Sequence, residues 1–259
     1  RRLPPTFHLS FSWDESDGYK RQANTVQNSH QLVSVNPIPV DILQQQVDAL
    51  LHDKTPTVIK IGLIVTLEQV FWLAKTLKQL RNLLPTLITI YDPVGQASVG
   101  GNLNTLSISE LTPLLQQVDI VTPNLTEAKW LVSDNTPTST TINLLAENIY
   151  QKFGINSIII KGGHLDDNEQ CFDFCYHQLN QIKQDNQEKH HQIICYQLSS
   201  PRINTNYSHG GGCSFASALA SFLALGYLVR DAFTLTKSFI NQGLLATKMV
   251  SAQQNHQYY

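Results

Sequence analysis

Apolar runs of strand length alternate with amphipathic stretches of helical period along most of this chain. Buried strands are indicated by the runs TVIKIGLI (57–64), LITIYDPV (87–94), DIVTP (119–123) and SIIIKGG (157–163). Helices are indicated between them, because apolar residues recur there every three or four positions. Strands that alternate with helices favour a mostly parallel sheet covered on both faces. We therefore expect an α/β protein of three layers, in one domain over residues 1–259.

The remaining elements follow from the same patterns. Shorter strands are expected at 6–11, 24–27 and 31–35, and an antiparallel pair at 172–177 and 192–198. The polar stretch 178–191 between that pair is expected to be a loop, and the tail after Ser251 to be frayed. The expected helices are 40–52, 67–84, a segment after Ser107, 126–132, 141–153, 214–225 and 231–250.

Charge and cysteine usage exclude several classes of protein. The chain has 18 Lys and Arg against 20 Asp and Glu, a net charge of −2, and both nucleic acid and anionic membranes require a basic surface. No apolar run approaches the roughly 20 residues that span a bilayer, and the first residues lack the apolar centre of a signal peptide. The four cysteines have no CxxC spacing, so neither zinc nor a redox pair is indicated. We expect a cytoplasmic protein that binds neither nucleic acid nor membrane.

Four polar turns mark the places where chemistry is expected. In an open parallel sheet, ligands bind beyond the carboxyl ends of the strands. Three turns follow expected strands, and a fourth, rich in glycine, leads into an expected helix. Their sequences are IYDPVG, VTPNLTEA, IKGGH and SHGGGCS (208–214).

The glycine-rich turn predicts a site for an anion. Successive glycines allow positive φ and close approach of the backbone to a ligand, and the free amides of a helix beginning at Ser214 attract phosphate. Cys213 stands at the start of that helix, where the pKa of a thiol is expected to fall below its usual value of about 8.5. A proton acceptor beside a phosphate site indicates phosphoryl transfer to an alcohol. The alternative is a glycine-rich helix start with an inert buried cysteine.

The other three turns carry candidate ligands for a metal and a phosphate. Asp92 and Glu127 supply the oxygen that Mg²⁺ prefers, and Asn124 lies beside Glu127. The alternatives are a turn residue before proline for Asp92 and a helix cap for Asn124 and Glu127. Lys161 ends the most apolar strand, where a lysine is unfavourable unless it meets an anion.

These turns, in this order, resemble the ribokinase-like superfamily, and within it the hydroxymethylpyrimidine and phosphomethylpyrimidine kinases of thiamine biosynthesis. Cys213 is the distinguishing residue, because sugar kinases of the superfamily end the glycine loop in Asp. The pyrimidine kinases typically read HGTGC, and this chain reads HGGGC. The blocks TVQNS, KIGL, DPV, TPNLTEA and IKGGHLDD are also similar to that subfamily, over roughly residues 24–250. The resemblance implies a three-layer ribokinase-like fold.

The resemblance also implies a role for each matching residue in phosphoryl transfer from ATP with Mg²⁺. Gln27 would hydrogen-bond the aminopyrimidine ring, and Ile64 and Val94 would line its pocket. Cys213 would take the proton of the hydroxymethyl group as that group attacks the γ-phosphate. Mg²⁺ would be held by Asp92 and Glu127. The phosphates would be held by Asn124, Lys161, Gly210, Gly211 and Gly212.

Departures from the family pattern keep three functions open. The loop lacks the family's threonine, a basic residue is missing after DPV, and about twenty family positions, rich in glycine, have no counterpart between Ser16 and Asp17. That gap is either a true deletion or a segment missing from this sequence. The first function is phosphorylation of an aminopyrimidine alcohol and of its monophosphate, by a possible homodimer. The alternatives are a kinase for pyridoxine-type vitamers and a degenerate, non-catalytic binding protein.

Overall fold

The main feature is a seven-stranded sheet in the order β1-β4-β5-β6-β7-β8-β9. The computed structural model describes residues 7–9, 23–27, 32–95, 106–133, 141–162, 169–181, 190–203 and 211–256. The strands from β1 to β7 in this order are parallel, and β8 and β9 are antiparallel, as expected. The bounds are β1 (Phe7–Leu9), β4 (Val58–Ile61), β5 (Ile88–Tyr91), β6 (Ile120–Val121), β7 (Ser157–Gly162), β8 (Gln170–Gln181) and β9 (His190–Pro201).

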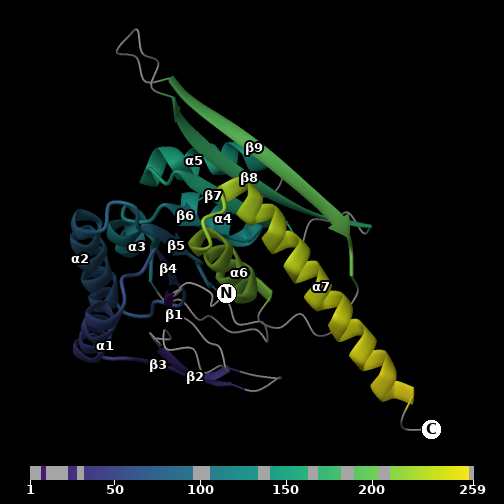
Figure 1. The fold of residues 1–259 in the computed structure, drawn as a ribbon, viewed down its shortest axis with the longest axis horizontal. Helices are drawn as coiled ribbons and strands as arrows, with labels where there is room; N and C mark the ends of the chain where they lie inside the picture. Colours follow the sequence, from purple (N-terminus) through teal and green to yellow (C-terminus); the bar gives the residue numbers. More distant parts are fainter. Residues whose placement is uncertain are drawn as a thin grey trace.

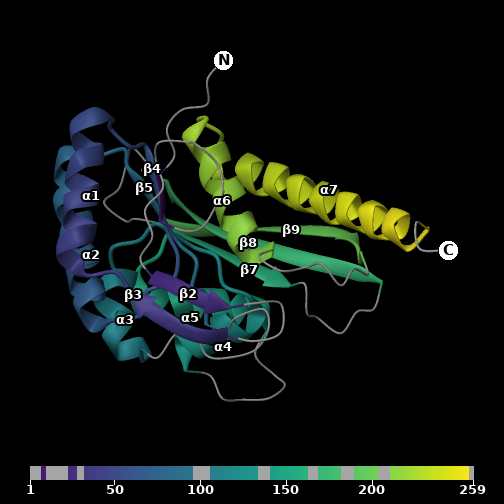
Figure 2. The same ribbon diagram turned by 90° about the horizontal axis from the view of Figure 1, so that it is seen from below.

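Helices cover both faces of this sheet, which confirms the three-layer α/β architecture (Figures 1 and 2). Strand β7 shows why both faces are covered, because its side chains point alternately into two apolar clusters, one on each face of the sheet. Ile158 and Ile160 pack with α2, α3, α4 and α5, whereas Ile159 packs with α6 and α7. The bounds are α1 (Val40–Asp53), α2 (Leu67–Leu83), α3 (Ile108–Leu115), α4 (Leu125–Val132), α5 (Ile142–Phe153), α6 (Gly211–Ala224) and α7 (Val229–His256). Within the described residues, no helix has the length and apolarity needed to cross a membrane.

Two expected strands form a small sheet of their own. Strands β2 (Ala23–Gln27) and β3 (Leu32–Pro37) pair antiparallel with each other and not with the main sheet. Their patterns predicted strands, but the partner of a short strand is decided by tertiary contacts that lie outside its own sequence.

Several expected boundaries were wrong. Strands β8 and β9 pair continuously from Gln170↔Pro201 to Gln181↔His190, so part of the expected loop 178–191 is strand. A hairpin can extend into a polar stretch because hydrogen bonds between the backbones of its two strands hold it together. Helix α6 begins at Gly211 rather than Ser214, and α7 continues to His256.

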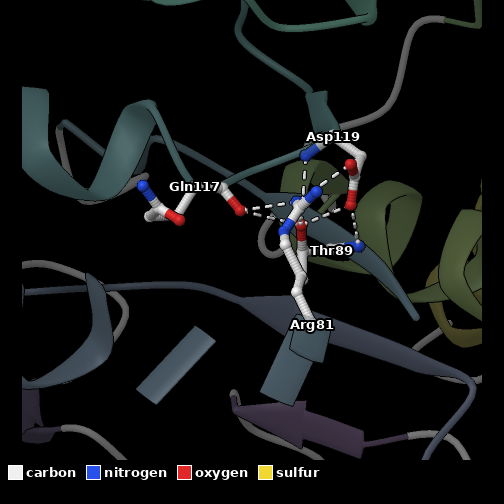
Figure 3. Close-up of polar contacts among 4 residues, drawn as sticks. All are labelled: Arg81, Thr89, Gln117 and Asp119. Atoms are coloured by element: carbon white, nitrogen blue, oxygen red, sulfur yellow. Dashed lines mark hydrogen bonds and ion pairs between the residues drawn. The ribbon is translucent and has the colours of Figure 1, made fainter. Parts of the chain in front are cut away.

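A polar network ties α2 to the amino ends of β5 and β6, the edge opposite the expected site (Figure 3). Asp119 accepts hydrogen bonds from the Thr89 amide at 2.8 Å and from the Thr89 hydroxyl at 2.6 Å. Arg81 donates to Asp119 at 2.9 Å and to the Gln117 carbonyl at 2.8 Å. The Asp119 amide donates to the Thr89 carbonyl at 3.0 Å, and the Asp119 carboxylate satisfies the Thr89 amide in return. The network therefore contributes to stability, because it satisfies a buried backbone donor.

Replacing Asp119 by alanine is expected to destabilise the protein by about 1–3 kcal/mol, because the buried Thr89 amide would lose its acceptor. Urea unfolding measures the effect. Asp231→Ala is the matched control, since its ion pair with Arg230 lies on the surface and is expected to change stability by less than about 1 kcal/mol. Equal losses in the two variants would contradict the role given to Asp119.

Candidate active site

The carboxyl ends of the parallel strands bring the candidate residues to one edge of the sheet. Asp92 follows β5, and its amide donates to the Ile61 carbonyl at the end of β4 (2.9 Å). The Lys161 amide donates to the Pro123 carbonyl (2.9 Å), and Asn124 forms a bridge with Lys161. Three turns that are far apart in the sequence therefore meet, as the sequence predicted.

Asp92 is the centre of the cluster. Its carboxylate is 2% exposed, and Oδ1 accepts from Lys161 Nζ at 2.9 Å and from the Thr122 hydroxyl at 2.9 Å. Asp92 also has a side-chain hydrogen bond with the Cys213 thiol. A carboxylate buried this deeply needs a cation and donors around it, and Lys161 and Thr122 supply them.

The first turn of α6 lies against Lys161. A Cβ on Gly212 would stand 3.2 Å from Lys161 Nζ, so a side chain here would push Lys161 Nζ away by a few tenths of an ångström. Positive φ occurs at Gly154 and Gly226 among the described glycines, so the expected positive φ of the loop is not found at Gly211 or Gly212. Because α6 begins at Gly211, Cys213 belongs to the first turn, whose amides have no partner within the helix. Gly210 lies outside the described residues.

Replacing Gly212 by alanine is expected to lower kcat/KM for the phosphate donor by about tenfold, because Lys161 must move while Asp92 still holds it. Steady-state kinetics measure the loss. Gly211→Ala is the matched control, since a Cβ there meets nothing within 4 Å. If the two alanine variants behave alike, the contact between Gly212 and Lys161 does not matter for the reaction.

The expected fall in the pKa of Cys213 was wrong. Burial raises the pKa of this thiol, and the charge of Asp92 raises it further. The charges of Lys60 and Lys161 lower it, but they do not outweigh burial and Asp92. The sequence placed Cys213 at a helix start, where the pKa of a thiol falls, but could not show the carboxylate beside it.

Glu127 and Asn124 form a capping box at the start of α4. The Asn124 side chain accepts from the Glu127 amide at 2.8 Å, and Glu127 Oε2 accepts from the Asn124 amide at 2.7 Å. The expected structural role is therefore present. Glu127 also accepts from the Gly95 amide at 3.4 Å, beside the DPV turn. Burial raises the pKa of Glu127, and the charge of Asp92 adds to the shift while Lys161 opposes it.

Asp92 and Glu127 fit a magnesium ion. The negative charges of the two carboxylates repel each other, and a cation between them relieves this repulsion. Both carboxylates lie at the edge of the sheet where phosphates are expected. Mg²⁺ is commonly held by one or two carboxylates together with water and substrate phosphates. In the described part of the chain no three acidic, histidine or cysteine side chains gather as metal ligands, so any cation here depends on water and phosphate.

Similarity to known proteins identifies the family of this chain. A family model described as phosphomethylpyrimidine kinase matches residues 22–257. The chain belongs to this family. The chain is 28% identical to the hydroxymethylpyrimidine/phosphomethylpyrimidine kinase of Bacillus subtilis strain 168, over 86% of this chain and 76% of that protein. It is 30% identical to a probable chloroplastic thiamine biosynthetic bifunctional enzyme of Oryza sativa subsp. japonica, over 87% of this chain and 38% of the rice protein.

A solved structure extends the likeness from the sequence to the fold. The pyridoxal kinase of Staphylococcus aureus in complex with AMP-PCP and pyridoxal superimposes with a TM-score of 0.66 and 26% identity. The match covers 86% of this chain and 75% of that chain. The ribokinase-like fold and membership of the phosphomethylpyrimidine kinase family, both expected from the sequence, are thereby confirmed.

Lys60 is a residue of the site that the sequence analysis missed. It is fully buried in β4, and its charge acts on Cys213. Val58 packs with α6 and Ile59 with the opposite layer, so alternation along the strand turns Lys60 toward α6. A lysine inside the run VIKI was the available signal, because a buried lysine is unfavourable unless it meets an anion.

The residues expected around the pyrimidine remain predictions. Ile64 is buried in the apolar cluster on the α2 side of the sheet, and Val94 is half-buried. Gln27 ends β2, and its side chain lies outside the described residues. The expected gap between Ser16 and Asp17 also lies outside them.

Proposed function

We propose that the protein transfers the γ-phosphate of ATP to 4-amino-5-hydroxymethyl-2-methylpyrimidine and then to the resulting monophosphate. The observation that carries the proposal is the contact of Lys161 with both Asp92 and the first turn of α6, which holds Cys213. This arrangement joins a site for phosphate to a group that can accept a proton. The name of the Bacillus subtilis relative supports the choice of substrate.

In the first reaction, the hydroxyl oxygen of the substrate attacks the γ-phosphorus of ATP. Cys213 takes the proton of this hydroxyl during the attack. The new P–O bond forms as the bond to the β-phosphate breaks, and ADP leaves. Lys161 and the free amides at the start of α6 would bind the phosphate oxygens and offset the charge that builds up on them. Burial lowers the pKa of Lys161, but the charges of Asp92 and Glu127 outweigh burial and raise it, so Lys161 is a cation at neutral pH.

Asp92 and Glu127 would hold Mg²⁺, directly or through water. Mg²⁺ supplies charge neutralisation on the transferred phosphate. The capping box fixes the Glu127 side chain, so this carboxylate is positioned before any ligand arrives.

Replacing Glu127 by glutamine is expected to raise the Mg²⁺ concentration for half-maximal activity by about tenfold, because glutamine keeps the cap but removes the charge. In the wild type the raised pKa of Glu127 predicts that the Mg²⁺ requirement rises as pH falls, beginning above the ordinary carboxyl range near 4.5. Titrations of Mg²⁺ at several pH values test both statements. A requirement that ignores pH, or a glutamine variant that matches the wild type, would contradict the assignment of Glu127.

A pyridoxal-type kinase is the second candidate, favoured by the pyridoxal kinase whose structure this fold matches. Specificity constants for the pyrimidine alcohol and for pyridoxal, measured side by side with ATP and Mg²⁺, separate the two. We expect the pyrimidine to be preferred by at least about tenfold, equal to 1.4 kcal/mol in transition-state binding. Preference for pyridoxal would select the second candidate, and turnover of neither substrate by folded protein would select a non-catalytic binding protein.

A further inference from the structure

A buried ion pair that the proposed reaction does not use lies beside the phosphate site. Lys237 Nζ of α7 lies 2.7 Å from Asp173 Oδ2 of β8, and the two side chains are 11% and 8% exposed. Lys237 Nζ also donates to the Cys171 carbonyl at 3.4 Å. A buried ion pair contributes little net stability compared with apolar residues, so its presence here invites another explanation.

Asp173 joins this pair to the strand end that carries Lys161. In the antiparallel register, Asp173 lies opposite Lys161. Its second oxygen, Oδ1, accepts a hydrogen bond from the Gly162 amide at 2.9 Å, in a fully buried contact. One carboxylate therefore binds α7 through Oδ2 and the residue after Lys161 through Oδ1.

Helix α7 joins the same pair to the first turn of α6. Phe233 is one helical turn before Lys237, and its ring packs edge-to-face on Phe215 of α6 at 6.4 Å between centroids. Phe215 is two residues after Cys213. The two helices also pack together on one face of the sheet (Figure 2). Lys237 is thus linked to the helix turn that holds Gly212 and Cys213 through the packing of Phe233 on Phe215.

We infer that Asp173 and Lys237 are positioning residues that hold the strand end with Lys161 at the correct distance from the first turn of α6. This inference rests on the proposed function, because it assigns these two elements to one phosphate site. Neither residue need touch the nucleotide. Loss of the pair lets the two halves of the site move apart, which weakens binding of the phosphates and leaves the pyrimidine contacts unchanged.

The test measures nucleotide binding and steady-state kinetics in variants of the ion pair and in one control variant. Lys237→Met leaves the Asp173 charge buried without its cation, so the double variant Asp173→Asn/Lys237→Met provides a second protein with neither charge. Lys237→Arg keeps the cation and serves as the rescue. Arg81→Met removes an ion pair at the opposite edge of the sheet and serves as the control for stability alone.

We expect the dissociation constant for AMP-PCP, measured by calorimetry on folded protein, to rise about tenfold in the double variant, equal to 1.4 kcal/mol of binding. KM for ATP should rise with it, while KM for the pyrimidine stays unchanged and Lys237→Arg recovers most of the loss. An unchanged dissociation constant in the folded double variant, or an equal rise in Arg81→Met, would overturn the inference. Wild-type protein that binds AMP-PCP but phosphorylates nothing would instead overturn the proposed function, so the two failures are distinguishable.

Discussion

Cys213→Ala is expected to lower kcat for phosphorylation of the pyrimidine alcohol by about 10²–10⁴-fold, the usual loss when a general base is removed. The second reaction should lose much less, because the attacking phosphate, with a second pKa of about 6, is already ionised at neutral pH. Separate assays with the alcohol and with the monophosphate measure the two effects. Equal losses in both reactions would mean that Cys213 acts by position or packing rather than as a base.

The role of Cys213 as a base also predicts how the rate with the alcohol changes with pH. Burial and Asp92 raise the pKa of Cys213, so the base is ionised only as pH rises through and above the usual thiol range near 8.5. The rate with the alcohol should therefore keep rising into alkaline pH. Cys213→Asp should move this rise to lower pH, because a carboxyl group ionises below a thiol even when buried. A profile that is the same in the wild type and the aspartate variant would contradict the assignment.

Lys161→Met is expected to lower kcat by about 10²–10³-fold and to raise KM for ATP, because a fixed cation at the transferred phosphate is lost. The same change leaves Asp92, which is 2% exposed, without its cation and is expected to destabilise the protein by about 3–5 kcal/mol. Urea unfolding and steady-state kinetics measure the two losses.

The double variant Lys161→Met/Asp92→Asn separates the effect on stability from the effect on catalysis. Removing both charges should restore most of the stability, because no isolated charge remains buried. Activity should stay low, since Lys161 and one proposed magnesium ligand are both missing. Recovered activity in the double variant would show that Lys161 acts only by neutralising Asp92.

The sequence was sufficient for the order of the elements because each buried strand needs an apolar run and each covering helix an apolar face. It was insufficient where a local preference was overridden by distant contacts. Gly211 and Gly212 are poor helix formers, yet they begin α6, where the missing side chain of Gly212 leaves room for Lys161. The antiparallel pair of β8 and β9 was predicted, but its extension into the polar stretch 178–191 was missed for a related reason, since pairing of one strand with the next does not require apolar side chains.

The sequence predicted which strand ends form the candidate site. It did not predict which side chains of the site contact each other. Parallel strands end at one edge, so Asp92, Asn124 and Lys161 could be placed together from their turns alone. The ion pair of Asp92 with Lys161 and its hydrogen bond to Cys213 depend on side-chain directions in three layers, which no local pattern encodes. The pair of Asp173 with Lys237 was missed for the same reason, because 64 residues separate its partners.

The central claim is that the phosphoryl group passes from ATP to a hydroxymethylpyrimidine. The most direct test is to incubate the protein with Mg²⁺, the pyrimidine alcohol and ATP labelled with ¹⁸O in the γ-phosphate, and to follow the products by mass spectrometry. The account predicts a labelled monophosphate that appears first and a doubly phosphorylated product that follows, with one ADP formed for each group transferred. ADP formed with no label in the pyrimidine, or no ADP formed by folded protein, would contradict it.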